Sequence, residues 1–151
     1  KDITPNNMPE WGMVNSIDQS PHDPATAYMA VTRYKMDDFK PYLYKTGNYG
    51  KSWKAIADED NVWGYVLSYV QDPLEPNLQF LGTEFGLYVS IDGSKTWTKW
   101  TSGFPTVSTM DLKIHPREHD LVIGTFGRAA YILDDIRALR ELASSYEDLM
   151  K

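Results

Sequence analysis

Three carboxylates of this chain lie among aromatic residues and could do chemistry on a sugar. Asp37 and Asp38 follow Tyr34 in a polar stretch, and Glu84 directly precedes Phe85. Aromatic rings stack on the apolar faces of sugars, and carboxylates accept hydrogen bonds from sugar hydroxyls. The pattern predicts a ligand-binding face for a polysaccharide, a peptide or a partner protein. Its further candidate residues are Trp11, Trp63, Tyr65 and Arg128.

Glycoside hydrolysis is the reaction that such carboxylates could support. It needs two carboxyl groups about 5 to 10 Å apart across the sugar. Asp37, Asp38 and Glu84 are the weak candidates, and nothing in their spacing marks two of them as a pair. We therefore expect a binding module without catalytic residues of its own. The alternative is a fragment of a glycoside hydrolase whose catalytic residues lie partly on other segments.

Other kinds of site find little support in the sequence. The chain has no cysteine, so it can form neither a disulfide nor a thiolate metal site. His22 falls in a different copy of a repeat from His115 and His119, so the three histidines predict no shared metal. The acidic run 58–60 is typical of a solvated surface, with a surface Ca²⁺ as the alternative. We predict no metal and no cofactor.

Composition and charge exclude two classes of partner. The 151 residues suffice for one ordinary domain, and the net charge of −6 with no basic patch argues against nucleic acid. No apolar run approaches the length of about 18 residues that a membrane span requires. The aromatic content of 13% suits a β-rich core as well as a sugar or protein surface.

The elements that would position these residues are organised around an octet that occurs twice. The copies are Thr46-Gly-Asn-Tyr-Gly-Lys-Ser-Trp53 and Ser90-Ile-Asp-Gly-Ser-Lys-Thr-Trp97. The amide or carboxylate at the third position can accept N–H groups across a turn, and the glycines allow positive φ. Each tryptophan is expected to place its indole between neighbouring sheets. The octets are therefore predicted to be structural, through Thr46, Asn48, Gly50, Ser52, Trp53, Ser90, Asp92, Gly93, Thr96 and Trp97.

The octets belong to a repeat of about 45 residues. Each copy has an alternating strand, a proline turn and a second strand, and the first two copies continue through a third strand and an octet into a fourth. Four short antiparallel strands joined by tight turns are typical of a propeller blade. The sequence thus predicts an all-β fold of about three blades. The three proline turns are 20–24, 72–76 and 115–119.

The repeat also predicts the boundaries within the chain. A propeller segment over 1–135 divides into blades at 9–58 and 59–103 and an incomplete last blade at 104–135. Residues 1–8 match the stretch after an octet tryptophan, which predicts the outer strand of a preceding blade.

A C-terminal helix or linker is expected over 136–151, with the helix itself at 136–149. Asp134 and Asp135 are its predicted caps, and its apolar stripe is predicted at Ile136, Leu139, Leu142 and Ala143.

The expected blade geometry places the structural octets and the candidate ligand-binding residues on opposite faces. Turns between second and third strands share a face with the connectors between blades, and the octets lie on the opposite face. The candidate ligand-binding residues all fall on the connector face. Trp11 and Trp63 occupy equivalent places there and either line a binding surface or pack between blades.

Closed propellers need at least four blades, so three are not enough. The segment is either a piece of a longer propeller, which we favour, or it is completed by another chain along its open edges.

The octets resemble the Asp-box (BNR) motif, Ser/Thr-x-Asp-x-Gly-x-Thr-Trp, of sialidase-like, xyloglucanase-like and sortilin (VPS10)-like propellers. The second octet departs from it at Ser94, where glycine is usual, and the first has Asn48 in place of Asp. The stretches 77–90 and 114–125 look like the closing blades of large secreted bacterial BNR/sortilin-like proteins, often labelled glycosyl hydrolase.

The resemblance covers about residues 1–137 and departs at Gly127-Arg-Ala129, where the family continues Gly-Arg-Gly. It implies a propeller fold and a secreted, periplasmic or cell-surface bacterial protein, and it implies no substrate. A sialidase-like site would need several converging arginines, and only Arg33 and Arg128 are near enough in this arrangement.

Overall fold

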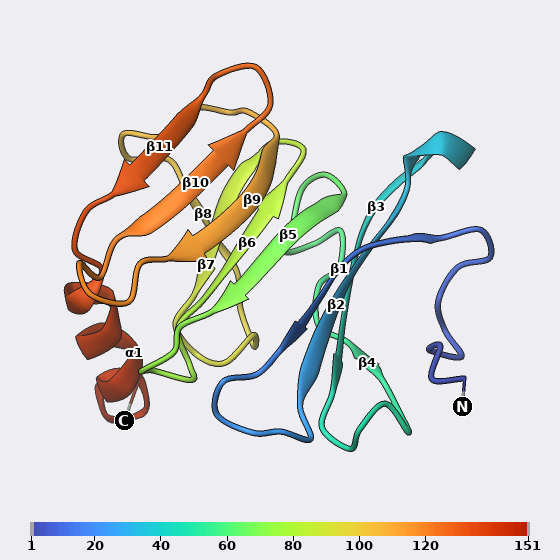
Figure 1. Cartoon of the computed structure of the whole chain (residues 1–151), viewed down its shortest axis with the longest axis horizontal. Coiled ribbons are helices and arrows are strands. Elements are labelled where there is room, and N and C mark those ends of the chain that lie inside the picture. Colours follow the sequence, from blue (N-terminus) through green and yellow to red (C-terminus); the bar gives the residue numbers. More distant parts are fainter. Residues whose placement is uncertain (1, 151) are drawn as a thin grey trace.

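The computed structural model describes residues 2–150, apart from the side chains of Glu147 and Leu149. It consists of three antiparallel sheets and one C-terminal helix (Figure 1). The first sheet has the order β1 (Met13–Gln19), β2 (Ala27–Arg33), β3 (Asp38–Thr46) and β4 (Lys54–Ala55), with a short 3₁₀ helix, η1 (Tyr34–Met36), before β3. The second has the order β5 (Val66–Gln71), β6 (Gln79–Thr83), β7 (Gly86–Ser90) and β8 (Thr98–Trp100). The third contains β9 (Thr109–Ile114), β10 (Leu121–Thr125) and β11 (Ala130–Leu133).

The sheets are consecutive blades of a partial propeller, so the predicted fold class is confirmed. Every strand pairs with the next one along its own sheet, which makes each sheet a meander. The first strands of the three sheets are neighbours, since β5 contacts both β1 and β9. Figure 1 shows β4 and β11 at opposite outer sides of the molecule.

The alternating residues of the strands form the two cores between the blades. Tyr28 and Leu43 of the first sheet pack against Tyr69 and Leu81 of the second. Phe80 of the second sheet belongs to the other core, together with residues of the third sheet. Because successive residues of a strand point to opposite faces, Phe80 and Leu81 serve different interfaces. Each blade therefore needs apolar residues on both faces, which gives β6 its burial along its whole length.

The two octets form matching polar loops. Asp92 Oδ1 accepts hydrogen bonds from the N–H groups of Lys95 and Thr96, both at 3.0 Å, and Oδ2 accepts one from the Thr96 hydroxyl at 2.6 Å. Asn48 Oδ1 accepts from the Ser52 N–H at 2.9 Å, and its amide donates to the Ser52 hydroxyl at 2.8 Å. An amide can thus replace the carboxylate, because the bond that Asp92 accepts from the Thr96 hydroxyl becomes a bond that Asn48 donates to the Ser52 hydroxyl.

Each octet tryptophan reaches the chain segment that precedes its blade. The Trp97 indole donates to the carbonyl of Ile56 at 2.9 Å, and the Trp53 indole donates to the carbonyl of Ile3 at 2.7 Å. Trp97 is buried in the core between the first and second sheets. Ile3 and Ile56 therefore hold equivalent positions in the repeat.

The expected outer strand over residues 1–8 is not formed. Residues 2–8 have no strand, and Lys1 lies outside the described residues. A β-strand requires hydrogen bonds to a neighbour, and no third strand of a preceding blade is present beside this segment. Its contacts are instead with the first blade, through Ile3 and through Met8, which packs beside Met29 and Val31.

The C-terminal helix α1 (Arg137–Leu149) is present close to the expected residues. Ile136 and Ala143 are buried in the core of the second and third sheets, and Leu139 packs against it. Leu142 was predicted to join them but is 45% exposed, because the buried stripe passes through Ala143 instead.

The predicted capping of α1 is only partly present. Ile136 is the N-cap residue and makes no side-chain cap bond. Asp135 accepts a hydrogen bond from the Arg137 N–H at 3.3 Å and pairs with its guanidinium at 2.7 Å. The bonds from Arg137 lower the pKa of Asp135 to about 2.

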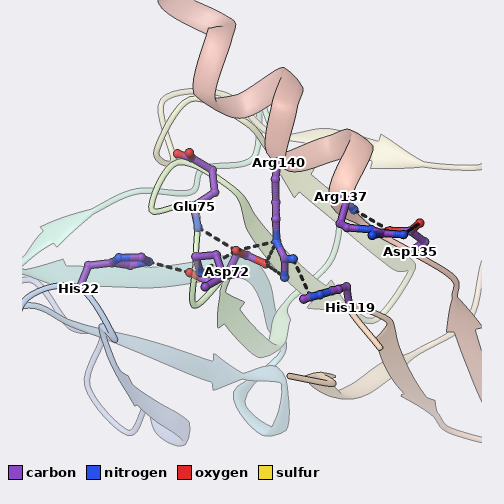
Figure 2. Close-up of polar contacts among 8 residues, drawn as sticks. His22, Asp72, Glu75, His119, Asp135, Arg137 and Arg140 are labelled. Atoms are coloured by element: carbon purple, nitrogen blue, oxygen red, sulfur yellow. Dashed lines mark hydrogen bonds and ion pairs between the residues drawn. The ribbon is translucent and has the colours of Figure 1, made fainter. Parts of the chain in front are cut away.

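A buried ion pair fixes α1 to the second blade. Figure 2 shows Arg140 reaching from the helix between Asp72 and His119. The Asp72 carboxylate is fully buried and accepts from the Arg140 guanidinium at 2.8 and 3.0 Å, and from the N–H groups of Leu74 and Glu75 at 2.9 and 2.8 Å. Since arginine only donates, His119 Nδ1 must accept the second bond from Arg140, at 2.8 Å.

The first blade joins the same junction. His22 Nε2 lies 2.7 Å from the carbonyl oxygen of Asp72, and because a carbonyl only accepts, His22 donates. The junction of His22, Asp72, His119 and Arg140 thus connects all three blades and the helix through hydrogen bonds.

We predict that Asp72→Ala lowers the free energy of unfolding by about 3 to 5 kcal/mol, because it leaves the Arg140 guanidinium buried without its partner. Urea unfolding followed by tryptophan fluorescence measures the change. The matched control is Asp135→Asn, which removes the charge of the solvent-exposed pair with Arg137, keeps a residue type that tolerates the positive φ of 50° at this position, and should change stability little. Equal losses in the two variants would contradict the structural role of the buried pair.

A second prediction concerns the octet carboxylate. Burial by itself would raise the pKa of Asp92, but the bonds from Thr96, Ser90 and Lys95 outweigh it and lower the pKa. Asp92→Ala should cost about 1 to 3 kcal/mol of unfolding free energy at pH 7, since the loop N–H groups lose their acceptor.

Asp92→Asn should cost less, because Asn48 already fills the equivalent place with an amide. In the wild type, the Asp92 carboxylate should contribute less to the free energy of unfolding as the pH falls below about 4 and through its lowered pKa, because the folded carboxylate then takes up a proton. Thermal unfolding between pH 3 and pH 7 tests both variants. An Asn variant as unstable as the Ala variant would disprove that an amide can replace the octet carboxylate.

Candidate functional site: an aromatic groove between two blades

A groove with a volume of about 610 Å³ lies on the connector face, where the first and second blades meet. One wall comes from η1 and the start of β3, and the other from the connector before β5 and the turn between β6 and β7. Both turn and connector belong to the face opposite the octets. The lining residues are Arg33, Met36, Asp37, Asp38, Phe39, Lys40, Pro41, Glu59, Val62, Trp63, Gly64 and Phe85.

Trp63 is the largest aromatic side chain of the groove. Its ring stacks on Phe85 with centroids 4.2 Å apart, and 59% of the residue is exposed. The Trp63 N–H donates to the Tyr88 hydroxyl at 3.0 Å, which fixes the connector to the second blade. Gly64 has φ of 86°, and a Cβ there would lie 2.8 Å from the Phe85 ring, so glycine is required for this stacking.

Lys99 places a positive charge on this aromatic surface. Its ammonium lies over the Trp63 ring, 5.1 Å from the centroid. A cation–π contact at an exposed site contributes only about 0.5 to 1 kcal/mol, so a ligand ring could displace it. The displaced ammonium would then be available to donate hydrogen bonds to the same ligand.

A second group of stacked rings borders the groove. Tyr34 and Tyr65 stack with centroids 5.0 Å apart, and Phe39 lies 6.2 Å from Tyr65. Burial, and secondarily the charge of Glu84, raises the pKa of Tyr65. Because Phe39 lines the groove, these rings extend its aromatic border along the first blade.

Asp38 is engaged by neighbouring groups of its own blade. Its Oδ2 accepts from the Tyr42 hydroxyl at 2.8 Å and from Arg33 at 3.2 Å, and Oδ1 accepts from the Lys40 N–H at 3.3 Å. Although burial opposes them, these bonds lower the pKa of Asp38. Burial and the bond to Asp38 raise the pKa of Tyr42 to about 12. Asp38 is therefore an ionised structural acceptor rather than a proton donor.

The other two candidate acids lie in different surroundings. Asp37 ends η1 with φ of 59° and lines the groove. Glu84 is in the turn before Phe85 but is not among the lining residues, and its N–H donates to the Tyr65 carbonyl at 3.1 Å. Burial raises the pKa of Glu84. The structure thus gathers Asp37 and Asp38 on one wall and leaves Glu84 behind the other.

Trp11 and Arg128 are likewise absent from the lining of the groove. Trp11 is 75% exposed on the connector before the first blade, and Arg128 is exposed in the turn between β10 and β11. The structure brings Asp37, Asp38, Trp63 and Phe85 together, with Tyr34 and Tyr65 stacked beside them.

Three charged residues of the site, Lys99, Lys40 and Glu59, were not predicted from the sequence. Lys99 contacts Trp63, and Lys40 pairs with Glu59 at 3.4 Å between the two walls. The pairing of Tyr88 with Lys99 could have suggested the first, because Tyr88 also holds the Trp63 backbone. The Lys40–Glu59 pair had no local signal, since it joins the start of β3 to the connector before β5.

Over residues 2–150, leaving aside the two undescribed side chains, no three His, Cys, Asp or Glu side chains gather where they could hold a metal ion. Within the same part of the chain, no helix has the length and apolar character needed to cross a membrane. The groove offers stacking rings, paired charges and one ammonium, which is chemistry suited to binding a hydroxylated ligand.

Comparisons with known proteins support the fold. No family model matches the chain, and no curated protein matches it. Among solved structures, a GH74 enzyme of Niastella koreensis aligns with a TM-score of 0.67 and 19% identity, covering 81% of this chain and 21% of that one. An ancestral GH74 enzyme aligns with a TM-score of 0.62 and 23% identity, covering 78% of this chain and 14% of that one. The GH74 xyloglucanase of Xanthomonas campestris aligns with a TM-score of 0.51 and 16% identity, covering 87% of this chain and 22% of that one. The chain therefore spans about a fifth or less of these structures, and the likeness is one of fold.

We predict that Asp38→Asn lowers the free energy of unfolding at pH 7 by about 1 to 2 kcal/mol, because the bonds from Arg33 and Tyr42 are weakened. A carboxylate whose folded pKa is lowered stabilises the fold above its unfolded pKa of about 3.9. The difference from wild type should therefore shrink as the pH falls from about 4 through the lowered pKa. Chemical denaturation at several pH values measures it.

Asp37→Asn is the matched control for this prediction. Asparagine also tolerates the left-handed conformation that Asp37 adopts at the end of η1. Its stability should stay close to that of wild type at every pH. A pH-independent difference between the Asp38 variant and wild type would show that Asp38 does not contribute as an ionised group.

Proposed function

We propose that this chain is a portion of a larger propeller protein and binds a polysaccharide in the groove between its first two blades. The observation that carries the proposal is the exposed Trp63 ring, stacked on Phe85 beside Lys99 and Asp37. Aromatic rings next to charged hydrogen-bonding groups suit the alternating apolar faces and hydroxyl edges of a sugar chain. A groove volume of about 610 Å³ is in the usual range for ligand sites.

The fold neighbours favour xyloglucan as the first ligand to test. One of them is a xyloglucanase, and all three are GH74 enzymes. The alternative function is a fragment of a glycoside hydrolase of this kind. Burial raises the pKa of Glu84, which suits an acid that donates a proton, but Glu84 does not line the groove, and the engagement of Asp38 by Arg33 and Tyr42 also counts against this alternative.

The proposal also covers the wider family and the place where the protein acts. The hydrogen bonding of both octets supports a relationship to Asp-box, BNR and sortilin-like propellers. Such a protein would be secreted, periplasmic or on the bacterial cell surface, where polysaccharides and protein ligands are accessible. Its remaining blades, or another chain, would cover the open faces of the first and third sheets.

Binding is tested by isothermal calorimetry with xyloglucan oligosaccharides, cello-oligosaccharides and an unrelated glucan. We expect Trp63→Ala to weaken binding about tenfold or more, which corresponds to about 1.4 kcal/mol. The matched control is Tyr49→Ala, which removes an exposed ring from the octet face and should leave affinity unchanged. Circular dichroism verifies that both variants are folded.

The same preparations distinguish the two functions. A binding module gives saturable binding and no release of reducing sugar. Release that disappears in Glu84→Gln or Asp37→Asn would favour the hydrolase fragment instead. Binding unaffected by Trp63→Ala would refute the groove as the site, and binding of a protein ligand in place of any glycan would refute the ligand class.

A further inference from the structure

A second groove, with a volume of about 740 Å³, lies between β4 of the first blade and the octet of the second. It shares no lining residue with the groove at Trp63. Three lysines line it, Lys45, Lys54 and Lys95, together with one acidic residue, Asp58. A chain with a net charge of −6 thus gathers three positive charges and one negative charge around one groove.

Two of these lysines form a like-charge pair across neighbouring strands. Lys45 of β3 is directly opposite Lys54 of β4, so both side chains lie on one face of the sheet. Like charges at directly opposite positions destabilise a sheet. The equivalent pair of the second blade, Val89 opposite Thr98, carries no charge. The first blade thus has an unfavourable electrostatic contact that the fold does not require and that a bound anion would offset.

The three lysines have no ion-pair partner within the described part of the chain. Lys45 instead places its ammonium over the buried Tyr28 ring, 5.6 Å from the centroid, on the side of the sheet that faces the second blade. The bonds from Thr26 and Ala25 lower the pKa of Asp23, and the charge of Lys45 contributes less to this lowering. The positive charge of the groove is therefore available to a ligand.

Two side-chain acceptors of the groove are already engaged. Asp58 Oδ1 accepts from two backbone N–H groups, both at 3.1 Å, and from the Asn61 amide at 2.6 Å. The Ser52 hydroxyl oxygen accepts from the Asn48 amide at 2.8 Å, which leaves its own proton to be donated. A neutral sugar hydroxyl is both donor and acceptor, whereas a carboxylate only accepts. A groove in which donors predominate suits an anionic ligand.

We propose that this second groove binds an acidic polysaccharide through the carboxylates of its uronate residues. The ammonium groups of Lys45, Lys54 and Lys95 donate to the carboxylates. The half-buried Trp53, which also lines the groove, offers an apolar surface to a sugar ring, and this favours a sugar chain over an acidic peptide. The lysines belong to two adjacent blades, so the site needs neither the groove at Trp63 nor its ligand.

Isothermal calorimetry tests the proposal with an oligogalacturonate and a neutral galacto-oligosaccharide of the same length. We expect tighter binding of the oligogalacturonate, weaker at about 250 mM than at about 25 mM salt because salt screens exposed charges. Lys95→Gln should weaken this binding about fivefold, the factor that corresponds to about 1 kcal/mol for an exposed charge pair.

Lys54→Gln adds a readout that non-specific attraction would not give. It should weaken oligogalacturonate binding to a similar extent and raise the unfolding temperature of the ligand-free protein, because it removes the repulsion from Lys45. The oligogalacturonate should in turn raise the unfolding temperature of the wild type more than that of this variant. Thermal unfolding followed by tryptophan fluorescence measures both effects.

The matched control is Lys51→Gln. Lys51 holds the same octet position in the first blade as Lys95 in the second, is exposed, and does not line the groove. The control removes the same charge from the chain and should leave oligogalacturonate affinity unchanged.

Absence of oligogalacturonate binding by the wild type would overturn the proposal, and so would equal losses in Lys51→Gln and Lys95→Gln. Tighter binding of an oligoglutamate peptide of similar charge would overturn the ligand class. Titration of oligogalacturonate into wild type saturated with xyloglucan oligosaccharide separates this result from the proposed function. The two grooves share no residue, so we expect the same oligogalacturonate affinity with and without xyloglucan.

Discussion

The hydrogen bond from an octet tryptophan to the backbone of the preceding blade is the interaction on which the architecture depends. Trp97 fills the space between the first two sheets and donates to the Ile56 carbonyl, so one residue sets both their separation and their alignment. It can do so only because the polar loop before it is satisfied internally by Asp92. The same bond joins Trp53 to the Ile3 carbonyl, although within the described residues no sheet precedes the first blade.

Local signals made much of the fold predictable. The octets, the proline turns and the alternation of the strands are each set by residues close in sequence, and the structure has them at the expected places. The predictions that were wrong concern residues whose structure or burial depends on a neighbouring segment. Residues 2–8 have the sequence of an outer strand and no strand to pair with, and Leu142 has the helical spacing of a core residue on a face that nothing covers.

The sequence predicted on which face of the blades the candidate site lies and which aromatic residues belong to it, but not the charged residues that contact them. The repeat placed Trp63, Phe85 and Asp37 on one side of the molecule, because connectors and the turns between second and third strands lie together. Lys99 contacts Trp63 from the outer strand, and Lys40 of β3 pairs with Glu59 of the connector before β5, so both contacts depend on packing between segments distant in sequence. A repeat pattern specifies such contacts only where every copy shares them.

Trp11 shows that equivalent places in the repeat can have different surroundings. It holds the place of Trp63 in the repeat, yet the first blade has η1 where the second has the short turn that carries Phe85. Trp11 is 75% exposed and does not line the groove. The groove at Trp63, by contrast, has both of its walls within this chain. The groove is formed by residues of two adjacent blades alone, so a ligand site there needs no other segment to complete it.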